Sequence, residues 1–495
     1  MTQLSIDTRD DQPDAKALIV AMAVFALLSA LMAVMSQGFL EADGVTHYLF
    51  ARYALREPQY LVNVWGRPLF TALYALPAAW GGLVATRAVS LLLALGCALI
   101  TWRVARLQQH RLPAIAVICL LAQPLFFLHS FSELTELPFA TALIAAFGAY
   151  AKRQWCAMAM LAGVLPLGRP EGFGFIGLAA VALIAHRRWW WCFILPLPLV
   201  AWSFAGWVIS ERPDDLAWWQ WLVREWPYSA QSAYGRGHAL AFVARLPVIA
   251  SPLLFPFMLI GITCAVRSSW RSALNDHRRR CELLIALIPL MILIGHSVLW
   301  WGGWMASNGE LRYLLIVAPF WAMLATRGFE WAWSELHWPR PMQWAGILAL
   351  LPGLINFYYP VLPLPLHADA LIARDVAGWY QQREHIRRDY PRVMSSPPML
   401  FYFLDRDPSD SSRAVQWSRE RVAAAPDGTL LVWDPIFGPH NADHNLVVHR
   451  SDILAAGWIH LGTFRRWEPA PTKGQWQEKS AEIFLSPRTI GGARP

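Results

Sequence analysis

Long apolar runs separated by short polar loops dominate the first three quarters of the chain. About eleven of these runs approach the ~20 residues that a helix needs to cross a bilayer. We predict spans at residues 17–36, 84–102, 112–131, 135–151, 156–168, 172–186, 189–209, 248–266, 283–302, 311–327 and 343–366. The pattern predicts an α-helical polytopic membrane protein, with a polar tail at residues 1–16 and a multi-span domain at residues 17–366.

The distribution of Lys and Arg predicts the orientation of these spans. Alternate loops are basic and carry Arg103, Arg106 and Arg111, then Lys152 and Arg153, then Arg187 and Arg188, then Arg267, Arg271, Arg278, Arg279 and Arg280. The facing loops at residues 131–136 and 303–310 contain no Lys or Arg. By the positive-inside rule, the N-terminus is cytoplasmic. Glu41, the loop 210–247 and everything after residue 366 are then extracytoplasmic.

Residues 367–495 are charged and Pro-rich, and they contain no further span. We predict a helix over 367–390, strands at 399–404, 429–434 and 445–450, and a second helix over 411–425. Such alternation is typical of a small α/β domain, which is extracytoplasmic in this orientation. Its ligand-like residues are Asp434, His440, Asp443 and His444. No helical pattern aligns them, so we interpret them as polar loop residues rather than a metal site.

Composition excludes several classes of protein. Apolar residues make up 56% of the 495 residues and 28 are Trp, which excludes an ordinary soluble domain. The net charge of +8 follows the loops and reports orientation, so we predict no nucleic-acid partner. All six Cys fall in predicted spans or cytoplasmic loops, which supports no disulfide framework and no Cys-based zinc site. Nucleotide use lacks support, because the chain has no Gly-rich dinucleotide fingerprint and no P-loop.

Candidate chemistry begins with Glu41 and Asp43, which directly follow the first apolar run. Residues 45–55 then read as an amphipathic helix at the membrane surface, ended by Pro58. Asp43 is therefore a candidate catalytic carboxylate. The alternative is that it only caps this helix, a role that Asp fills well.

Other charges fall at the outer ends of spans: Arg67, Glu133, Glu136, Arg169, Glu171, Glu310 and Arg312. Charges at such depth are costly, so they usually face protein or a wet cavity. Each one alone is also explained by an intramembrane salt bridge, a snorkelling side chain or a helix break, above all the Arg169–Glu171 turn. Together with Asp43, they indicate carboxylates and guanidiniums gathered at the outer surface.

The order of these segments resembles the GT-C superfamily of membrane glycosyltransferases, which use polyprenyl-phosphate-linked sugars. The resemblance rests on the acidic loop with Glu41 and Asp43, then on the segments 67–70 (RPLF), 132–133 (SE), 169–172 (RPEG) and 310–313 (ELRY). The last segment is similar to the His-Lys-Glu-x-Arg-Phe motif of mannosyltransferases that use dolichol-phosphate mannose. Asn308 and Gly309 replace its His-Lys.

The resemblance implies transfer of a mannose-like sugar from a polyprenyl-phosphate donor to a lipid or glycan acceptor. Asp43 would be the general base, and Glu41 would position the acceptor or assist. Arg312, with Arg67 as second candidate, would bind the donor phosphate, and Glu310 belongs to the same substrate-binding segment.

The Trp-rich loop 210–247 contains Arg236 and His238 on either side of Gly237. Gly permits close backbone approach, so this segment is a further candidate for donor binding. The Trp residues could stack on sugar rings or line a lipid groove, but an interfacial aromatic belt is the favoured interpretation. No cofactor is certain, although Glu41, Asp43 and Glu310 are oxygen ligands of the kind that Mg²⁺ or Mn²⁺ prefers.

Two other functions fit the same composition. A transporter or flippase of lipid-linked saccharides would also gather charges in a wet cavity, but along a path through the spans and with matched repeats. Here the charges concentrate at the outer rim, which favours an enzyme. A non-catalytic scaffold, whose external domain binds a partner, would tolerate substitution of Asp43.

Overall fold

The computed structural model describes residues 11–210, 217–221, 226, 230–232, 234–335, 361–436, 438–439, 446–469 and 476–487. The chain forms two compact units. The first comprises Met1–Met35 and Phe50–Leu362, and the second comprises Ser36–Leu49 and Pro363–Pro495. The segment that follows the first span therefore folds with the C-terminal region.

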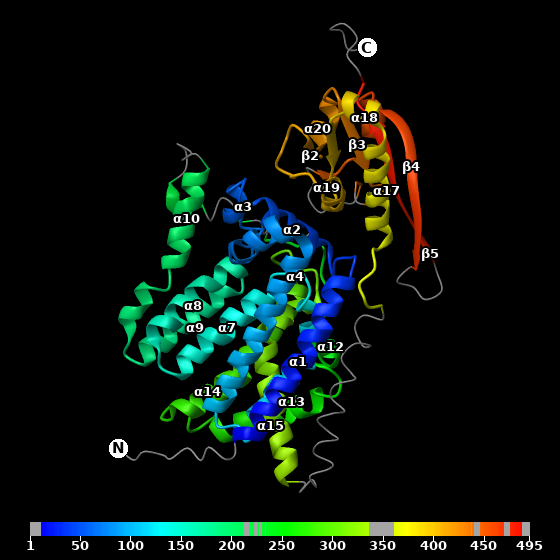
Figure 1. Ribbon diagram of the computed structural model, residues 1–495. Helices are drawn as coiled ribbons and strands as arrows, with labels where there is room; N and C mark the ends of the chain where they lie inside the picture. The colour runs from blue at the N-terminus through cyan, green and yellow to red at the C-terminus, as the bar shows by residue number, and fades with distance from the viewer. Residues whose placement is uncertain are drawn as a thin grey trace. The chain divides into compact units, whose positions relative to one another are not determined.

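The first unit is helical (Figure 1). Its elements are α1 (Asp11–Met35), α2 (Ala42–Tyr53, which begins in the second unit), α3 (Gln59–Val62), α4 (Pro68–Leu107), α5 (Pro113–Leu121), α6 (Pro124–His129), α7 (Glu136–Ala151), α8 (Trp155–Gly168), α9 (Gly172–Ala185), η1 (Trp189–Phe193), α10 (Leu197–Ile209), η2 (Trp218–Gln220), α12 (Ala241–Ala250), α13 (Phe255–Ser269), α14 (His277–Gly302), η3 (Leu311–Val317) and α15 (Ala318–Glu335). Helices α7, α8 and α9 pack side by side in chain order.

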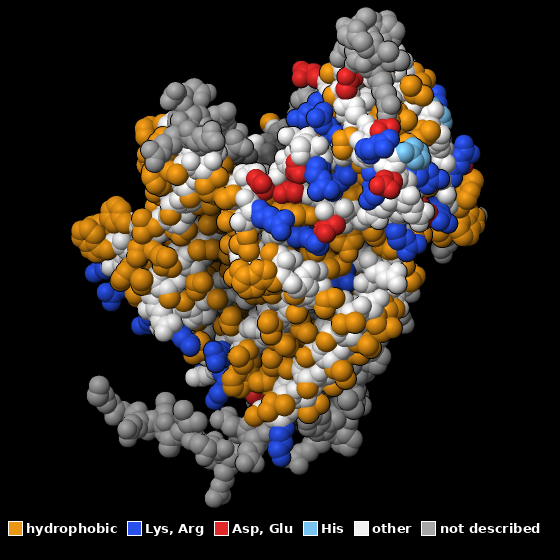
Figure 2. Space-filling model, turned by 45° about the horizontal axis from the view of Figure 1, so that its top comes forward, with side chains coloured by type: hydrophobic (Ala, Val, Ile, Leu, Met, Phe, Trp, Pro, Cys, Tyr) orange, Lys and Arg blue, Asp and Glu red, His pale blue; other side chains and the backbone are white. Residues whose placement is uncertain are grey.

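Several helices of the first unit suit a bilayer. Within the described residues, α1, α4, Trp189–Ile209 and α14 are long and apolar enough to cross one. Helices α7, α8 and α9 are apolar but shorter, with 16, 14 and 14 residues. Apolar side chains are exposed along α1, and Figure 2 shows hydrophobic side chains over much of the visible face of this unit. Such a surface is stable in lipid but not in water. The predicted span 343–366 lies mostly outside the described residues.

The predicted span at residues 248–266 is broken in the structure. Helices α12 and α13 meet at a bend of 108°. The break falls at Ser251, whose φ of 81° places it in the left-handed region, and Pro252 follows directly. A residue before proline avoids helical backbone angles, so the apolar run alone does not reveal this break.

Helices α13 and α15 cross at two glycines. A Cβ at Gly261 would overlap the carbonyl oxygen of Leu324, and a Cβ at Gly328 would overlap that of Phe257. The two backbones therefore touch directly. Helices inside lipid have no hydrophobic driving force to associate. Small residues at such crossings let the backbones pack closely, and the van der Waals contacts hold the helices together.

We expect Gly328→Ala to destabilise the first unit by about 1–3 kcal/mol, because the methyl group must push two packed backbones apart. Gly174→Ala in α9 is the matched control, since nothing lies within 4 Å of the position that its Cβ would take. Thermal unfolding of the purified protein in detergent measures both. A Gly328→Ala variant as stable as Gly174→Ala would show that the crossing tolerates the extra volume.

The second unit contains a five-stranded mixed sheet of order β2-β1-β3-β5-β4. Its elements are α17 (Ala368–Gln382), α18 (Glu384–Asp389), β1 (Arg392–Ser395), α19 (Pro398–Leu404), β2 (Ala414–Gln416), α20 (Arg419–Ala424), β3 (Thr429–Trp433), α21 (Arg450–Ala455), β4 (Ile459–Pro469) and β5 (Trp476–Leu485). Strand β1 is parallel to β2 and β3, whereas β5 is antiparallel to β3 and β4.

Strand β3 lies at the centre of this sheet and is buried along its whole length. Leu430 and Val432 pack against α17 on one face. Leu431 and Trp433 pack in the other core, with side chains from α20 and α21. The alternation of strand side chains thus places one helical layer on each face of the sheet.

The structure confirms the predicted strand at 429–434 and corrects its neighbours. Residues 399–404 lie in helix α19 rather than a strand. Residues 446–449 form no strand, and Arg450 begins α21. The helix predicted at 411–425 is instead strand β2 followed by α20, and the helix at 367–390 is split into α17 and α18.

Candidate active site

A tight turn between α8 and α9 presents two charged side chains. Arg169 ends α8 with extended backbone angles (φ −161°, ψ 153°), and Glu171 immediately precedes α9. Gly172 begins α9 so close to Leu165 that a Cβ would overlap its backbone. The sequence Arg-Pro-Glu-Gly therefore ends one helix, starts the next and orients both charges.

The guanidinium of Arg169 bridges two buried carboxylates. Its Nη1 lies 2.6 Å from Oε1 of Glu136, the first residue of α7. Its Nε and Nη2 donate to Glu171 Oε1 at 3.2 Å and 3.1 Å. Thr135 Oγ1 accepts a further hydrogen bond from Nη1 at 3.4 Å. Such a fork-shaped donor can hold two carboxylates at a fixed separation.

The segment before and within η3 supplies the facing side of this site. Arg312 Nε donates to Glu310 Oε2 and lies 3.8 Å from Glu136 Oε1. Asn308 Nδ2 donates to the other oxygen of Glu310, and the Tyr313 hydroxyl donates to Asn308 Oδ1. The Arg169 guanidinium lies over the Tyr313 ring, with its Cζ 5.2 Å from the centroid. An aromatic face stabilises a nearby cation.

Two histidines complete the site, each with Nε2 turned towards a carboxylate. His296 Nε2 lies 3.2 Å from Glu171 Oε1, and the His296 ring stacks on Tyr313. His129 Nε2 lies 3.9 Å from Glu136 Oε2. His129 Nδ1 lies 2.8 Å from the Leu125 carbonyl oxygen, which can accept its proton and leave Nε2 as the acceptor.

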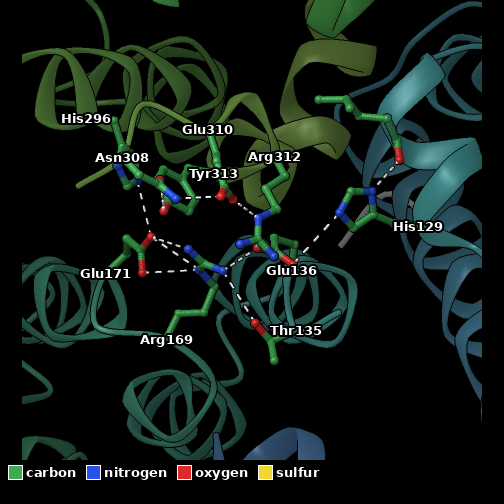
Figure 3. Close-up of polar contacts among 11 residues, drawn as sticks. His129, Thr135, Glu136, Arg169, Glu171, His296, Asn308, Glu310, Arg312 and Tyr313 are labelled. Carbon is green, nitrogen blue, oxygen red and sulfur yellow. Dashed lines mark hydrogen bonds and ion pairs between the residues drawn. The ribbon is translucent and has the colours of Figure 1, made fainter. Parts of the chain in front are cut away.

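We call this set the ion cluster (Figure 3): His129, Thr135, Glu136, Arg169, Glu171, His296, Asn308, Glu310, Arg312 and Tyr313. Its members come from α6, α14, the start of α7 and the residue before it, the α8–α9 turn, and η3 with the segment before it. Three carboxylates face two guanidiniums in a largely buried setting. Buried charges cost free energy unless they are paired, and here each guanidinium lies against at least two carboxylates.

Not every polar atom of the ion cluster is satisfied. Among the described residues, Glu136 Oε2, His129 Nε2 and His296 Nε2 are buried and lack a partner with hydrogen-bond geometry. Buried polar groups in folded proteins are nearly always hydrogen-bonded, so such exceptions often mark functional sites. Carboxylates, guanidiniums and imidazoles together can bind a phosphate and accept or donate a proton.

The start of α14 lies at the end of the helical bundle opposite the ion cluster, and several basic residues make contacts there. Arg278 Nη2 donates to the Gln108 carbonyl oxygen just after α4. His277 Nε2 lies 3.3 Å from the Ala151 carbonyl oxygen, and Arg280 Nη1 lies 2.9 Å from His186 Nε2. The basic loops after α4, α7 and α9 therefore meet at this end. His296 lies 19 residues after His277 along α14, about 28 Å away, which is close to the thickness of a bilayer core.

Neither a protein-family model nor a curated protein sequence matches this chain. Two solved structures of ArnT from Cupriavidus metallidurans do match, one in the apo state and one bound to undecaprenyl phosphate. Both align at a TM-score of 0.58 and 12% identity over 94% of this chain, and cover 98% and 97% of the ArnT chain. The fold is similar to that of ArnT. This likeness confirms the predicted fold class, a helical membrane domain with a C-terminal α/β domain.

Within this ArnT-like fold, two of the predicted substrate-binding residues belong to the ion cluster. These are Glu310 and Arg312, which interact directly with one another. Arg67 immediately precedes α4 with a φ of 61°, and its Nη1 donates to the Val64 carbonyl oxygen. Glu41 and Asp43 lie in the second unit, where Asp43 occupies the first turn of α2. Both acids are half-buried.

Arg236 and His238 lie beside the end of α14. Gly237 between them donates its N–H to the Trp300 carbonyl oxygen and packs on the Trp300 ring. His238 Nδ1 accepts from the Leu240 N–H. In the described part of the chain, neither side chain forms a hydrogen bond or ion pair with the ion cluster, and both are exposed. The backbone at Gly237 therefore lies close to Trp300, and a side chain at this position would overlap the Trp300 ring.

Glu133 forms a separate buried pair with Arg87. Their Nε and Oε1 atoms lie 2.6 Å apart, and Arg87 Nη1 also donates to the Ala33 carbonyl oxygen. Both side chains are 1% exposed. This pair joins α4 to the segment before α7 and so helps to hold the helix that begins with Glu136. The salt-bridge interpretation of Glu133 fits this geometry.

No group of three or more His, Cys, Asp or Glu residues is placed to hold a metal ion in the described ranges. His440, Asp443 and His444 lie outside the described residues. Sequence reasoning did not single out His129 and His296 as members of the ion cluster. The sequence does contain a signal for both histidines, namely a titratable side chain within an apolar run. Such a side chain is costly unless it has a polar partner.

Proposed function

We propose that this protein is an integral-membrane glycosyltransferase that moves a sugar from a polyprenyl-phosphate donor to a lipid or glycan acceptor. The observation that carries the proposal is the pair of buried guanidiniums, Arg169 and Arg312, held by carboxylates at one end of an apolar helical bundle. The fold adds support, because one of the similar ArnT structures is bound to undecaprenyl phosphate.

In this proposal the acceptor hydroxyl oxygen attacks the anomeric carbon of the sugar. The bond from that carbon to the phosphate oxygen breaks, and the polyprenyl phosphate leaves with the bonding electrons. Asp43 accepts the proton of the attacking hydroxyl, and Glu41 positions the acceptor. Arg312 stabilises the charge on the leaving phosphate, with Arg67 as a second candidate. Glu310 fixes the Arg312 guanidinium, and Arg236 and His238 are further candidates for contact with the donor.

We further propose that the reaction takes place on the extracytoplasmic face, with a cytoplasmic N-terminus. The basic loops gather at the end of the bundle where α14 begins, as the positive-inside rule expects of the cytoplasmic end. The ion cluster lies about one bilayer thickness away along α14. A mannose-like sugar and dependence on Mg²⁺ or Mn²⁺ are finer proposals, which a donor panel assayed with and without a chelator tests.

The central test is transfer of labelled sugar from a panel of polyprenyl-phosphate sugars to extracted lipid and glycan acceptors. We expect wild-type membranes to use at least one donor, and Arg312→Gln to lower the rate by about 10²- to 10³-fold, as loss of one donor to a developing anion does. Arg103→Gln, an exposed residue at the basic end of α4, is the matched control.

Two outcomes would contradict the proposal at different levels. If Arg312→Gln transfers sugar as fast as Arg103→Gln, Arg312 does not bind the leaving phosphate, although the enzyme assignment stands. If the wild type transfers no sugar but moves the labelled donor between leaflets of proteoliposomes, the protein is a saccharide-lipid transporter. The break between α12 and α13 favours this second function, since transporters often use broken helices.

A further inference from the structure

The second unit contains a cavity at the β2 edge of its sheet, the edge opposite β4. It has a volume of about 460 Å³ and lies beside β1, β2 and α20, with the loop at residues 408–411 as a wall. Small-molecule sites commonly enclose about 300–1,000 Å³. Polar lining side chains come from Arg392, Ser409, Ser411, Gln416 and Arg421. The cavity is therefore large enough for a ligand well beyond a single ion.

Arg392 is the first cationic side chain of this cavity. It is the first residue of β1, and its backbone N–H donates to the Gly428 carbonyl oxygen. Its Nε is buried and makes no hydrogen bond to any described residue. A guanidinium carries five N–H donors in one planar fork, so the other N–H groups of Arg392 suit an anionic ligand in the cavity.

Arg421 is the second cationic side chain and belongs to α20. One of its N–H groups donates to the Gln416 carbonyl oxygen at 2.9 Å, which fixes the guanidinium at the exposed rim. The side chains that line the cavity in the described residues include no Asp or Glu. The nearby Asp407 and Asp410 carboxylates accept hydrogen bonds from Ser409 and Ser412 within their own loop.

We propose that this cavity binds an anionic sugar unit, one that carries a phosphate or a carboxylate. Arg392 and Arg421 hold the anion, and the hydroxyl and amide groups of Ser409, Ser411 and Gln416 contact the sugar hydroxyls. The volume exceeds what an inorganic phosphate fills, and the polar lining matches a sugar better than an acyl chain. The proposal does not depend on glycosyl transfer, because binding is measured without any donor.

The experiment uses the full-length protein in detergent and saturation-transfer NMR titrations. The probes are glucose 1-phosphate and glucuronate, with neutral glucose and inorganic phosphate as comparisons. We expect the two anionic sugars to bind at least about 10-fold more tightly than glucose, because each charge-assisted hydrogen bond contributes that much or more. Inorganic phosphate should bind more weakly than glucose 1-phosphate, because it forgoes the sugar contacts.

Two variants test the arginines separately. Arg392→Gln and Arg421→Gln should each weaken binding of glucose 1-phosphate about 10- to 100-fold. Arg419→Gln is the matched control, since it is exposed on the same helix and does not line the cavity. Arg421 is also exposed, so its variant reports on binding even if Arg392→Gln fails to fold.

Three results would overturn the proposal. The first is equal binding of glucose and glucose 1-phosphate, and the second is equal binding by the Arg421→Gln and Arg419→Gln variants. The third is no binding of either anionic sugar by the wild type at concentrations up to tens of millimolar. Tight binding of inorganic phosphate alone would reject the sugar part and leave a simple anion site.

Discussion

Asp43→Asn should lower the rate of sugar transfer by about 10²- to 10⁴-fold, the usual contribution of a positioned general base. Asp43 lies in the first turn of α2, where an acidic residue also interacts favourably with the helix dipole. Asn keeps the shape of Asp and one side-chain oxygen that can cap a helix, but it cannot accept the proton. The substitution therefore separates catalysis from helix capping.

Radiolabelled transfer with the preferred donor, at matched protein levels in membranes, measures this effect. Glu41→Gln is the control, because Glu41 is equally half-buried but precedes α2 by one residue and has only an assisting role in the proposal. We expect Glu41→Gln to retain much more activity than Asp43→Asn. Transfer by Asp43→Asn within a few-fold of the wild type would leave Asp43 as a helix-terminus residue only.

Arg169→Met is expected to cost about 3–5 kcal/mol of stability, since it leaves two buried carboxylates without their shared partner. The Arg169 side chain is 8% exposed and those of Glu136 and Glu171 are 1% and 13% exposed, so water cannot replace the lost contacts. Thermal unfolding in detergent measures the loss. Arg103→Met, at an exposed position, should change stability little.

A triple variant sharpens this test. Adding Glu136→Gln and Glu171→Gln to Arg169→Met removes the unpaired charges, and it should recover part of the stability that Arg169→Met loses. Such recovery is a coupling between neighbours and identifies the charge imbalance as the cause. If the triple variant is less stable than Arg169→Met, the cost comes from lost packing of the long Arg side chain instead.

The sequence predicted the membrane domain more reliably than the C-terminal domain, for a physical reason. A span needs many consecutive apolar residues, so its signal survives local irregularity. Residues 399–404 show the opposite case. A short apolar run fits a buried strand or a buried helix, and only the preceding prolines indicate a helix start. Buried Leu400 and Leu404 in α19 are spaced by one helical turn.

The candidate site was partly predictable. Charged residues within apolar runs drew attention to Glu136, Arg169, Glu171 and Arg312, which the structure brings together. Sequence alone did not pair Arg169 or Arg312 with Glu136, because these residues are far apart in the chain and any of several charges could satisfy each one. The separate pairing of Glu133 with Arg87 illustrates this ambiguity, since Glu133 and Glu136 differ by less than one helical turn.

The second unit is built from two segments that are far apart in the chain, and this affects how the protein folds during synthesis. Phe39 and Tyr48 both pack on Tyr402, and the Gln37 and Gly38 N–H groups donate to the Leu364 carbonyl oxygen. Ser36–Leu49 leaves the ribosome more than 300 residues before most of these partners exist. Synthesis proceeds at about 5–20 residues per second, so the packing partners of the segment that carries Asp43 are made roughly 15–60 s after it. The loop can therefore reach its final packing only after the last domain of the chain has been made.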